Sequence, residues 1–132
     1  MPLRKVLVRE YMAANPVTVT PDTPILQAIH TLIEHRISGL PVVDLRGNLV
    51  GMLSESDCLP IAVQASYHGE LGGTVSEYMS QEVKTVDPDD SIVELAERFM
   101  RNKLRRFPVV ERQRVVGQIS RRDVLRAMEC LY

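Results

Sequence analysis

Two Ser-x-x-Asp elements stand in this sequence where a predicted strand runs into a predicted helix. The first is Ser54 with Asp57, and the second is Ser120 with Asp123. In each, the serine is suited to cap the helix N-terminus, and the aspartate can accept a hydrogen bond from the serine's own amide. Free amides and the positive end of the helix dipole at such a junction also attract anions. The spacing alone fits both a capping box and a helix start that holds an anionic ligand.

The chain contains an internal duplication. Pro41-Val42-Val43 recurs as Pro108-Val109-Val110, and Tyr11-Met12 recurs as Tyr78-Met79, at one constant displacement. The displacement becomes one residue shorter at the predicted hairpin turn, where a change of length is tolerated best. We place the first repeat at residues 8–67, a linker at 68–73 and the second repeat at 74–132.

Each repeat is predicted to have the order β-α-β-β-α. In the first repeat, a β-favouring run at 17–20 precedes a helix with an apolar face, for which Thr23 is the expected N-cap. Two apolar strands joined by a turn follow, and the Ser-x-x-Asp element begins the last helix. Two small sheets packed face to face about a pseudo-twofold axis would bury the valine-rich strands of both repeats. We therefore expect an α+β fold with mixed sheets.

The composition is that of a globular protein with a mainly aliphatic core. Of 132 residues, 45% are hydrophobic and none is Trp, and the formal net charge is −1. This charge gives no general attraction to nucleic acid or to an acidic membrane surface, and no apolar run is long enough to span a bilayer. The two cysteines, Cys58 and Cys130, are too few for a disulfide framework, which favours a cytoplasmic location.

The sequence offers no support for catalysis. No nucleophile, base and orienting group occur together, and no glycine-rich phosphate loop is present. The three histidines show no metal-ligand spacing with one another or with a cysteine. We expect a protein that is not an enzyme and that uses no metal or cofactor.

In their order and repetition, these motifs resemble those of a tandem cystathionine-β-synthase (CBS) domain pair, also called a Bateman module. The resemblance covers roughly residues 8–128. It is carried by the segments 38–44, 50–57, 106–111 and 116–123, each of which is a loose match by itself.

The resemblance implies a regulatory module that binds adenosine-containing ligands in the clefts between its repeats. AMP, ADP and ATP are the expected ligands, and S-adenosylmethionine ranks below them. In the family, the aspartate of the Ser-x-x-Asp element holds the ribose diol, and a basic residue before the Pro-Val-Val strand meets phosphate. Carried over by position, the expected ligand contacts are Ser54, Asp57, Ser120 and Asp123, then Arg105 and Arg106 for phosphate, and, for adenine, Val17 and Thr18 with Gln118, and Lys84 and Thr85 with Met52.

The second repeat is expected to provide the better nucleotide site. A guanidinium group matches the oxygens of a phosphate, and Arg105 and Arg106 stand just before the second Pro-Val-Val strand. Ser38 and Gly39 occupy the matching positions of the first repeat. Lys84 could compensate there, and the alternative reading of the two arginines is a solvated surface.

The resemblance also implies a homodimer formed through the helices, with an output that passes through an unknown effector protein. Two alternatives to nucleotide sensing stay open. The first is nucleic-acid binding by the basic stretch Arg98–Arg114, which ranks well below because the chain has few aromatic side chains to stack on bases. The second is a ligand-free structural dimer in which an arginine fills the cleft.

Overall fold

The computed structural model describes residues 6–69 and 72–131, except the side chain of residue 131. Contacts divide the chain into two units. The central unit consists of residues 17–83, and the C-terminal unit combines the residues up to Pro16 with those from Lys84 onward. These units differ from the sequence repeats. The short opening segment of the first repeat belongs to the C-terminal unit, and the short opening segment of the second repeat belongs to the central unit.

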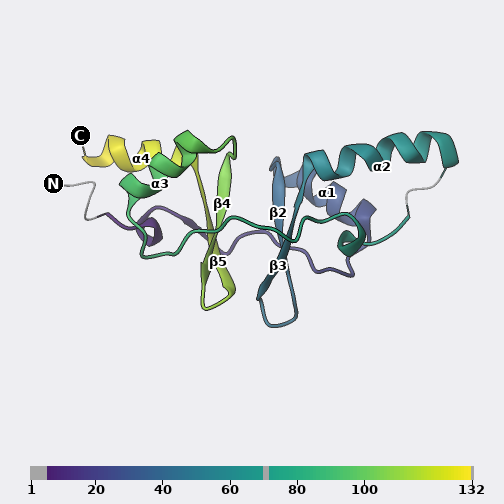
Figure 1. Ribbon diagram of the computed structural model, residues 1–132, viewed down its shortest axis with the longest axis horizontal. Helices are drawn as coiled ribbons and strands as arrows, with labels where there is room; N and C mark the ends of the chain where they lie inside the picture. Colours follow the sequence, from purple (N-terminus) through teal and green to yellow (C-terminus); the bar gives the residue numbers. More distant parts are fainter. Residues whose placement is uncertain (1–5, 70–71, 132) are drawn as a thin grey trace. The chain divides into compact units, whose positions relative to one another are not determined.

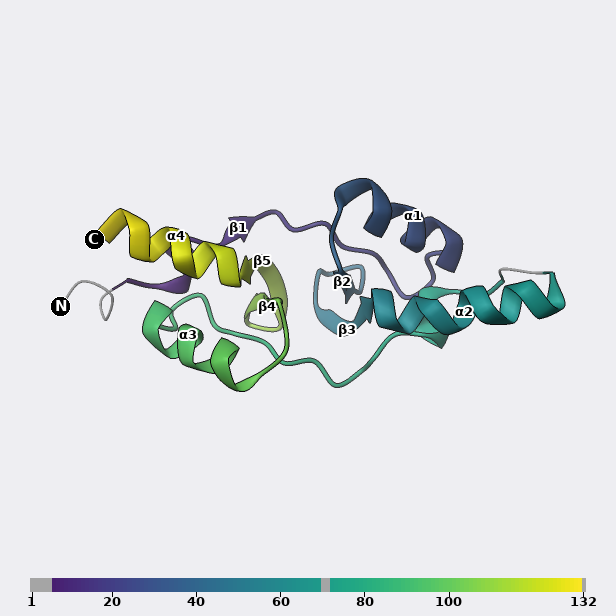
Figure 2. The ribbon, with the colours of Figure 1, turned by 90° about the horizontal axis from the view of Figure 1, so that it is seen from above.

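The C-terminal unit contains a three-stranded antiparallel sheet and two helices. β4 (Arg106–Glu111) and β5 (Arg114–Ser120) form a hairpin, and β1 (Ala13–Ala14) pairs with the other edge of β5. The helices α3 (Ile92–Arg101) and α4 (Arg121–Leu131) lie side by side next to this hairpin (Figures 1 and 2). α4 follows β5 without a break, as the sequence predicts.

The central unit repeats this arrangement with a two-stranded sheet. β2 (Gly39–Val43) and β3 (Leu49–Ser54) pair antiparallel, which confirms the predicted hairpin. α1 (Ile25–His35) precedes the hairpin, and α2 (Glu55–His68) follows it directly. All five residues of β2 are buried, as expected for an apolar strand of the core.

The predicted first strand at 17–20 is reduced to one residue. Val19 forms a single parallel bridge with Val42, in which the amide of Val43 donates to the Val19 carbonyl over 2.8 Å. The register of the hairpin shifts between Val42 and Val43, directly beside this bridge. The second repeat has the same bridge, between Val86 and Val109, beside the same shift in register. The duplication therefore preserves a local irregularity as well as the regular elements.

A short opening segment completes the core of each unit. The 3-10 helices η2 (Val8–Glu10) and η3 (Val75–Glu77) each begin with a fully buried valine. The amide of Val8 donates to the carbonyl of Asp90, and that of Val75 to the carbonyl of Thr23, both over 2.9 Å. Each segment is thus bonded to the turn before the first helix of its unit.

Two glycines let these segments approach the hairpins. A Cβ at Gly117 would lie 2.7 Å from Sδ of Met12 and 2.8 Å from the carbonyl oxygen of Ala13. A Cβ at Gly51 would meet Met79 and Ser80 in the same way. The methionines therefore pack where any side chain on the strand would collide with them.

Each unit has its own core, and both are mainly aliphatic, as the composition predicts. The C-terminal core also contains the aromatic pair Phe99 and Phe107, with ring centroids 4.9 Å apart. Its other buried residues are Val6, Val8, Val86, Ile92, Leu95, Val109, Ile119, Val124 and Ala127. The central core consists of Val19, Ile25, Ala28, Leu32, Leu40, Val42, Leu53, Cys58, Ile61 and Val75.

The prediction that Thr23 caps α1 was wrong. Pro24 holds the N-cap position and forms no side-chain cap. Oγ1 of Thr23 instead accepts a hydrogen bond of 3.1 Å from the amide of Thr20, which closes the preceding turn. In the second repeat, Ser91 holds the equivalent cap position, and its Oγ accepts from the amide of Glu94 over 3.0 Å.

α2 ends at His68, and Gly69 follows in the left-handed conformation, with φ of 74°. The predicted linker at 68–73 begins at this helix end, and its residues 70 and 71 lie outside the described residues. Within 6–69 and 72–131, no helix is both long and apolar enough to cross a membrane.

Candidate functional site

Ser120 and Asp123 form a capping box at the start of α4. The Ser120 amide donates to Oδ2 of Asp123 over 2.8 Å, and the Ser120 hydroxyl donates to the same oxygen over 3.0 Å. In return, the Asp123 amide lies 3.3 Å from Oγ of Ser120. The capping interpretation is therefore confirmed here, and the second carboxylate oxygen, Oδ1, is not used by the cap.

The start of α2 has the same box but a different environment. The amide of Ser54 donates to Oδ2 of Asp57 over 2.8 Å, and Oγ of Ser54 accepts from the Asp57 amide over 3.2 Å. At α4, Nη1 of Arg126 lies 3.3 Å from Oδ1 of Asp123, whose side chain is 16% exposed. The matching position on α2 is Pro60, which cannot form this ion pair.

Arg106 is placed beside the start of α4 by the register of the β4–β5 hairpin. It lies directly opposite Ser120 in the sheet. Its Nη1 donates to Oε1 of Gln118 over 3.0 Å, and Gln118 is itself only 8% exposed. Nε of Arg106 is buried and finds no hydrogen-bond partner among the described residues. A buried donor without an acceptor is costly, so this nitrogen is well placed to bind an anionic ligand.

Arg105 lies at the same place. Its carbonyl oxygen accepts a hydrogen bond of 3.2 Å from the amide of Arg121, the first residue of α4, while its side chain is exposed. The structure therefore brings Arg105, Arg106 and Ser120 together, as the sequence predicts.

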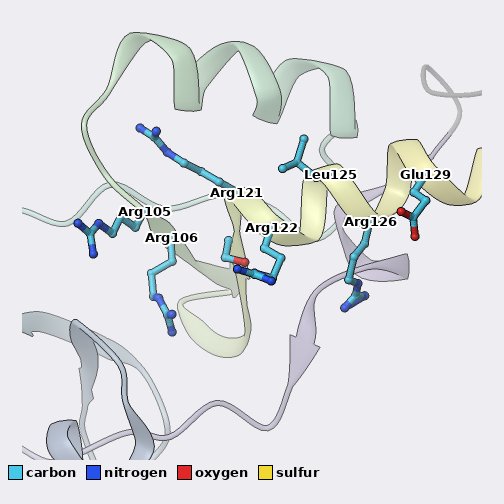
Figure 3. A pocket seen from close by; sticks show the side chains of 8 residues that line it. Arg105, Arg106, Arg121, Arg122, Leu125, Arg126 and Glu129 are labelled. Carbon is cyan, nitrogen blue, oxygen red and sulfur yellow. The ribbon is translucent and has the colours of Figure 1, made fainter.

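These residues border a hollow of about 760 Å³, a size typical of small-molecule sites (Figure 3). Arginines dominate its wall, and Glu129 is the one acidic side chain among the described residues that line it. The lining residues are Arg105, Arg106, Ser120, Arg121, Arg122, Leu125, Arg126 and Glu129. A concave surface with this excess of guanidinium groups attracts anions more strongly than a flat one.

Arg121 has a structural task. Its Nε donates to the carbonyl of Leu104 over 3.0 Å, and its Nη2 donates to the carbonyls of Phe99 and Asn102. Figure 3 shows its side chain directed toward α3, away from Arg106 and Arg126. It thereby supplies donors to carbonyls at the end of α3, which the helix itself leaves without partners.

Sequence reasoning missed Arg122 and Arg126 as candidates. The signal was present, because residues four apart on a helix share a face, and both follow the Ser120 cap closely. Comparison of the repeats would also have singled them out. The matching positions of the first repeat are Ser56 and Pro60.

The residues predicted to contact adenine are divided between the units. Gln118, Lys84 and Thr85 belong to the C-terminal unit, whereas Val17, Thr18 and Met52 belong to the central unit. Nζ of Lys84 donates to Oδ1 of Asn102 over 2.7 Å. The carbonyl of Thr85 accepts a bond of 2.7 Å from Nη1 of Arg98. Their role toward adenine stays a prediction.

The basic stretch Arg98–Arg114 does not act as a single free surface. Arg98 is bonded to Thr85, and its guanidinium carbon lies 4.6 Å from the centre of the Phe107 ring. Arg106 is bonded to Gln118. These internal contacts hold both side chains against the protein, while their neutral partners leave the positive charges in place.

Among the described residues, no group of three or more His, Cys, Asp or Glu side chains is arranged to hold a metal ion. Cys58 is buried, and this burial raises the pKa of its thiol. A raised pKa lowers the thiolate fraction at neutral pH, so Cys58 is a poor nucleophile.

Comparison with curated proteins gives relatives that this chain covers for most of their length, and longer relatives of which it covers less than half. The protein YhcV of Bacillus subtilis, described as CBS domain-containing, is 31% identical over 118 residues, which are 89% of this chain and 81% of YhcV. Inosine-5'-monophosphate dehydrogenase of Aquifex aeolicus is 32% identical over 117 residues, which are 87% of this chain. The chain matches only 23% of that dehydrogenase and 42% of the uncharacterized Methanocaldococcus jannaschii protein MJ1225.

Solved structures agree with the fold. The protein CBSX2, solved in complex with AMP, superposes with a TM-score of 0.83 at 26% identity, covering 95% of this chain and 97% of that one. The CBS domain pair of MJ0100, solved with 5'-methylthioadenosine and S-adenosyl-L-methionine, gives a TM-score of 0.76 at 28% identity, covering 96% and 98%.

The family model described as the CBS domain matches this chain twice, at residues 8–63 and at 75–130. Both matches contain one hairpin and one capping box of the duplicated fold. The chain therefore belongs to the CBS domain family and carries two CBS domains in tandem.

Proposed function

We propose that this CBS pair is a regulatory module that binds an adenosine-containing nucleotide of the AMP, ADP or ATP class, with its principal site at the start of α4. The observation that carries the proposal is the arginine-lined hollow beside Ser120, whose wall includes Arg106, a residue with a buried Nε that has no hydrogen-bond partner among the described residues. CBSX2 binds AMP, and the MJ0100 pair binds S-adenosyl-L-methionine and 5'-methylthioadenosine. These relatives support an adenosine ligand without fixing its phosphate count.

Each residue of the site has a distinct task in this proposal. Arg105 and Arg106 bind phosphate, because guanidinium donors pair well with phosphate oxygens. Oδ1 of Asp123, the oxygen that the cap leaves free, accepts hydrogen bonds from the ribose hydroxyls. Gln118 holds Arg106 in place from within the sheet.

The second candidate site, at Ser54 and Asp57, is proposed to bind nucleotide more weakly. Gly39, opposite Ser54 in the β2–β3 register, stands where Arg106 stands in the other hairpin. Lys84, proposed as a compensating charge for this site, is bonded to Asn102 in the C-terminal unit. The proposed adenine contacts stay Val17 and Thr18 with Gln118, and Lys84 and Thr85 with Met52.

Calorimetry and thermal shift with AMP, ADP, ATP and S-adenosylmethionine test the proposal, since a ligand that binds only the folded state raises the melting temperature. Asp123→Asn keeps an oxygen for the cap and removes the charge that the ribose contact uses. We expect this variant to lose nucleotide binding, and the matched control Asp57→Asn to keep most of it. Absence of binding by all four ligands would refute the function, and equal losses in the two variants would refute the ranking of the sites.

A ligand-free structural module is the second candidate, and the Arg126–Asp123 ion pair favours it. This pair already neutralises the carboxylate that the ribose would need. If the module is structural, Arg126→Gln should lower the melting temperature and nucleotides should leave it unchanged. A nucleotide-dependent rise in melting temperature excludes this candidate.

We further propose that the signal passes through rearrangement of a homodimer or of a bound effector protein. Met100 and Leu125 are 86% and 62% exposed on α3 and α4, and they line a mainly apolar groove of about 290 Å³ with Ala96, Phe99, Val124 and Arg121. A second copy would bury these side chains. Sedimentation of the wild type should show a dimer, and Leu125→Glu should shift it toward the monomer. A monomeric wild type would contradict the dimer and leave nucleotide binding untouched.

A further inference from the structure

The arginine-lined hollow holds more positive charge than a nucleoside monophosphate needs. Beyond the two arginines of the β4 start, α4 contributes Arg122 and Arg126. These two lie one helical turn apart on the same face, and Figure 3 shows both side chains reaching the same side of α4 as Arg106. Arg121 is committed to the carbonyls near the end of α3. Four arginines besides Arg121 therefore line the hollow, and one of them, Arg126, is paired with Asp123.

Resting on the proposed function, we propose that this hollow selects nucleoside di- and triphosphates over monophosphates, with Arg122 and Arg126 as the residues that bind the phosphates beyond the first. A monophosphate carries a charge of about −2 and three terminal oxygens. Two guanidinium forks are enough to saturate these oxygens. Every further phosphate adds charge and oxygens, and it extends the ligand from Arg106 toward α4.

The first repeat shows that the fold does not need these arginines. The helix start at α2 has the same capping box, yet it carries Ser56 and Pro60 where α4 carries Arg122 and Arg126. Gathering like charges in one hollow is unfavourable unless an anion neutralises them. We therefore infer that Arg122 and Arg126 serve ligand binding and are not needed for the fold.

Arg126 also couples the phosphates to the ribose. In the structure its Nη1 lies 3.3 Å from Oδ1 of Asp123, and its side chain is 56% exposed. A polyphosphate competes with this carboxylate for the guanidinium. When Arg126 turns to the phosphates, Oδ1 is released to accept from the ribose hydroxyls. A monophosphate held at Arg106 leaves the ion pair in place and binds less well for that reason too.

Calorimetry with AMP, ADP and ATP at one ionic strength is the test. We expect ADP and ATP to bind at least about tenfold more tightly than AMP, the effect of one or two charge-assisted hydrogen bonds. Arg122→Gln should weaken the binding of ATP about tenfold and the binding of AMP by less than about twofold. Arg126→Gln should also reduce the difference in affinity between ATP and AMP. Arg114→Gln, which removes an exposed arginine outside the hollow, is the charge-matched control and should preserve the preference.

The possible failures are distinguishable. AMP binding as tightly as ATP, or an equal effect of Arg122→Gln on both, would overturn the polyphosphate preference and leave nucleotide binding standing. Loss of the preference in the Arg114→Gln control would overturn it as well, because the effect would then be one of net charge. If none of the three nucleotides binds the wild type, the proposed function falls together with this inference.

Discussion

Arg106 and Gln118 are joined by a hydrogen bond of 3.0 Å between neighbouring strands, from Nη1 of the guanidinium to Oε1 of the amide. Because Gln118 is almost completely buried, this acceptor is fixed by the sheet. The bond orients a charged side chain at the rim of the hollow from inside the protein. Gln118 thus positions Arg106, in addition to its predicted contact with adenine.

Replacement of Gln118 by Leu should weaken nucleotide binding. A hydrogen bond to a charged group contributes about 1.5–3 kcal/mol, so we expect affinity to fall about tenfold. Calorimetry with the preferred nucleotide measures the loss. A Gln118→Glu variant, which keeps an acceptor for Arg106, should recover part of it. If Leu and Glu weaken binding equally, the orienting bond is not the cause.

Gly117→Ala should destabilise the fold. The new Cβ would meet both Met12 and the carbonyl of Ala13, and backbone cannot move away cheaply. Overpacking of this kind costs about 1–3 kcal/mol of the free energy of unfolding. Urea denaturation measures the loss. Gly72→Ala is the control, since no atom of the residues that the structure describes stands within 4 Å of its added Cβ, and its effect should stay within about 0.5 kcal/mol.

Arg121→Met should lower stability by about 1–2 kcal/mol, because three carbonyls near the end of α3 lose their donor. The measurement is the melting temperature together with denaturant unfolding. Arg114→Met, at an exposed position, should change stability by less than about 0.5 kcal/mol. Equal effects of the two substitutions would show that Arg121 acts only through its charge.

Asp44 should contribute stability that depends on pH. The backbone amides of Asn48 and Arg46 both donate to Oδ1 of Asp44, and the side chain of Asn48 donates to Oδ2. These bonds hold the pKa of the carboxyl below its usual value. The stabilisation is therefore complete above the unfolded pKa of about 4 and is lost as the pH falls through the lower folded pKa.

Asp44→Asn provides the matching measurement. The difference in unfolding free energy between wild type and variant should be constant near neutral pH and shrink below about pH 4. NMR titration of the carboxyl gives the pKa directly. A difference that stays constant to about pH 2, or a pKa above the usual range, would contradict the role of the turn.

The two cysteines should react at different rates with a thiol reagent. Cys130 is exposed on α4, whereas burial both shields Cys58 and raises the pKa of its thiol. Labelling of the native protein, followed by mass spectrometry, should modify Cys130 first. In denaturant the rates should become similar. Faster labelling of Cys58 in the native state would show that the central core opens readily.

Most of the fold could be predicted from the sequence because local signals agreed with the packing. The apolar runs ending in Ser54 and Ser120 became β3 and β5, and the capping boxes formed at both helix starts. The prediction that Thr23 caps α1 was wrong because its hydroxyl accepts a hydrogen bond from the amide of Thr20, which the spacing of the residues does not reveal. The packing of each repeat's opening segment in the other repeat's unit could not be predicted, since it depends on contacts between residues far apart in the chain.

The candidate site was predicted in part. The position of Arg106 opposite Ser120 follows from hairpin register, which the two strands and their turn determine. The task of Arg121 could not be predicted, because its partners come from α3 and the following loop. Arg122 and Arg126 could have been predicted from helical spacing, but they lie outside the residues of the family motif, which contains Asp123.

The buried valines of the opening segments, Val8 and Val75, make the two halves of this gene mutually dependent. A fragment cut at the repeat boundary, such as residues 8–67, would contain the central hairpin without the opening segment that packs on it. It would also contain an opening segment without the hairpin on which that segment packs. Such a fragment could be completed only by a second polypeptide that lends the missing piece. The two copies, once fused, can therefore diverge in charge and ligand preference, as the α2 and α4 helix starts have done, but they cannot be separated.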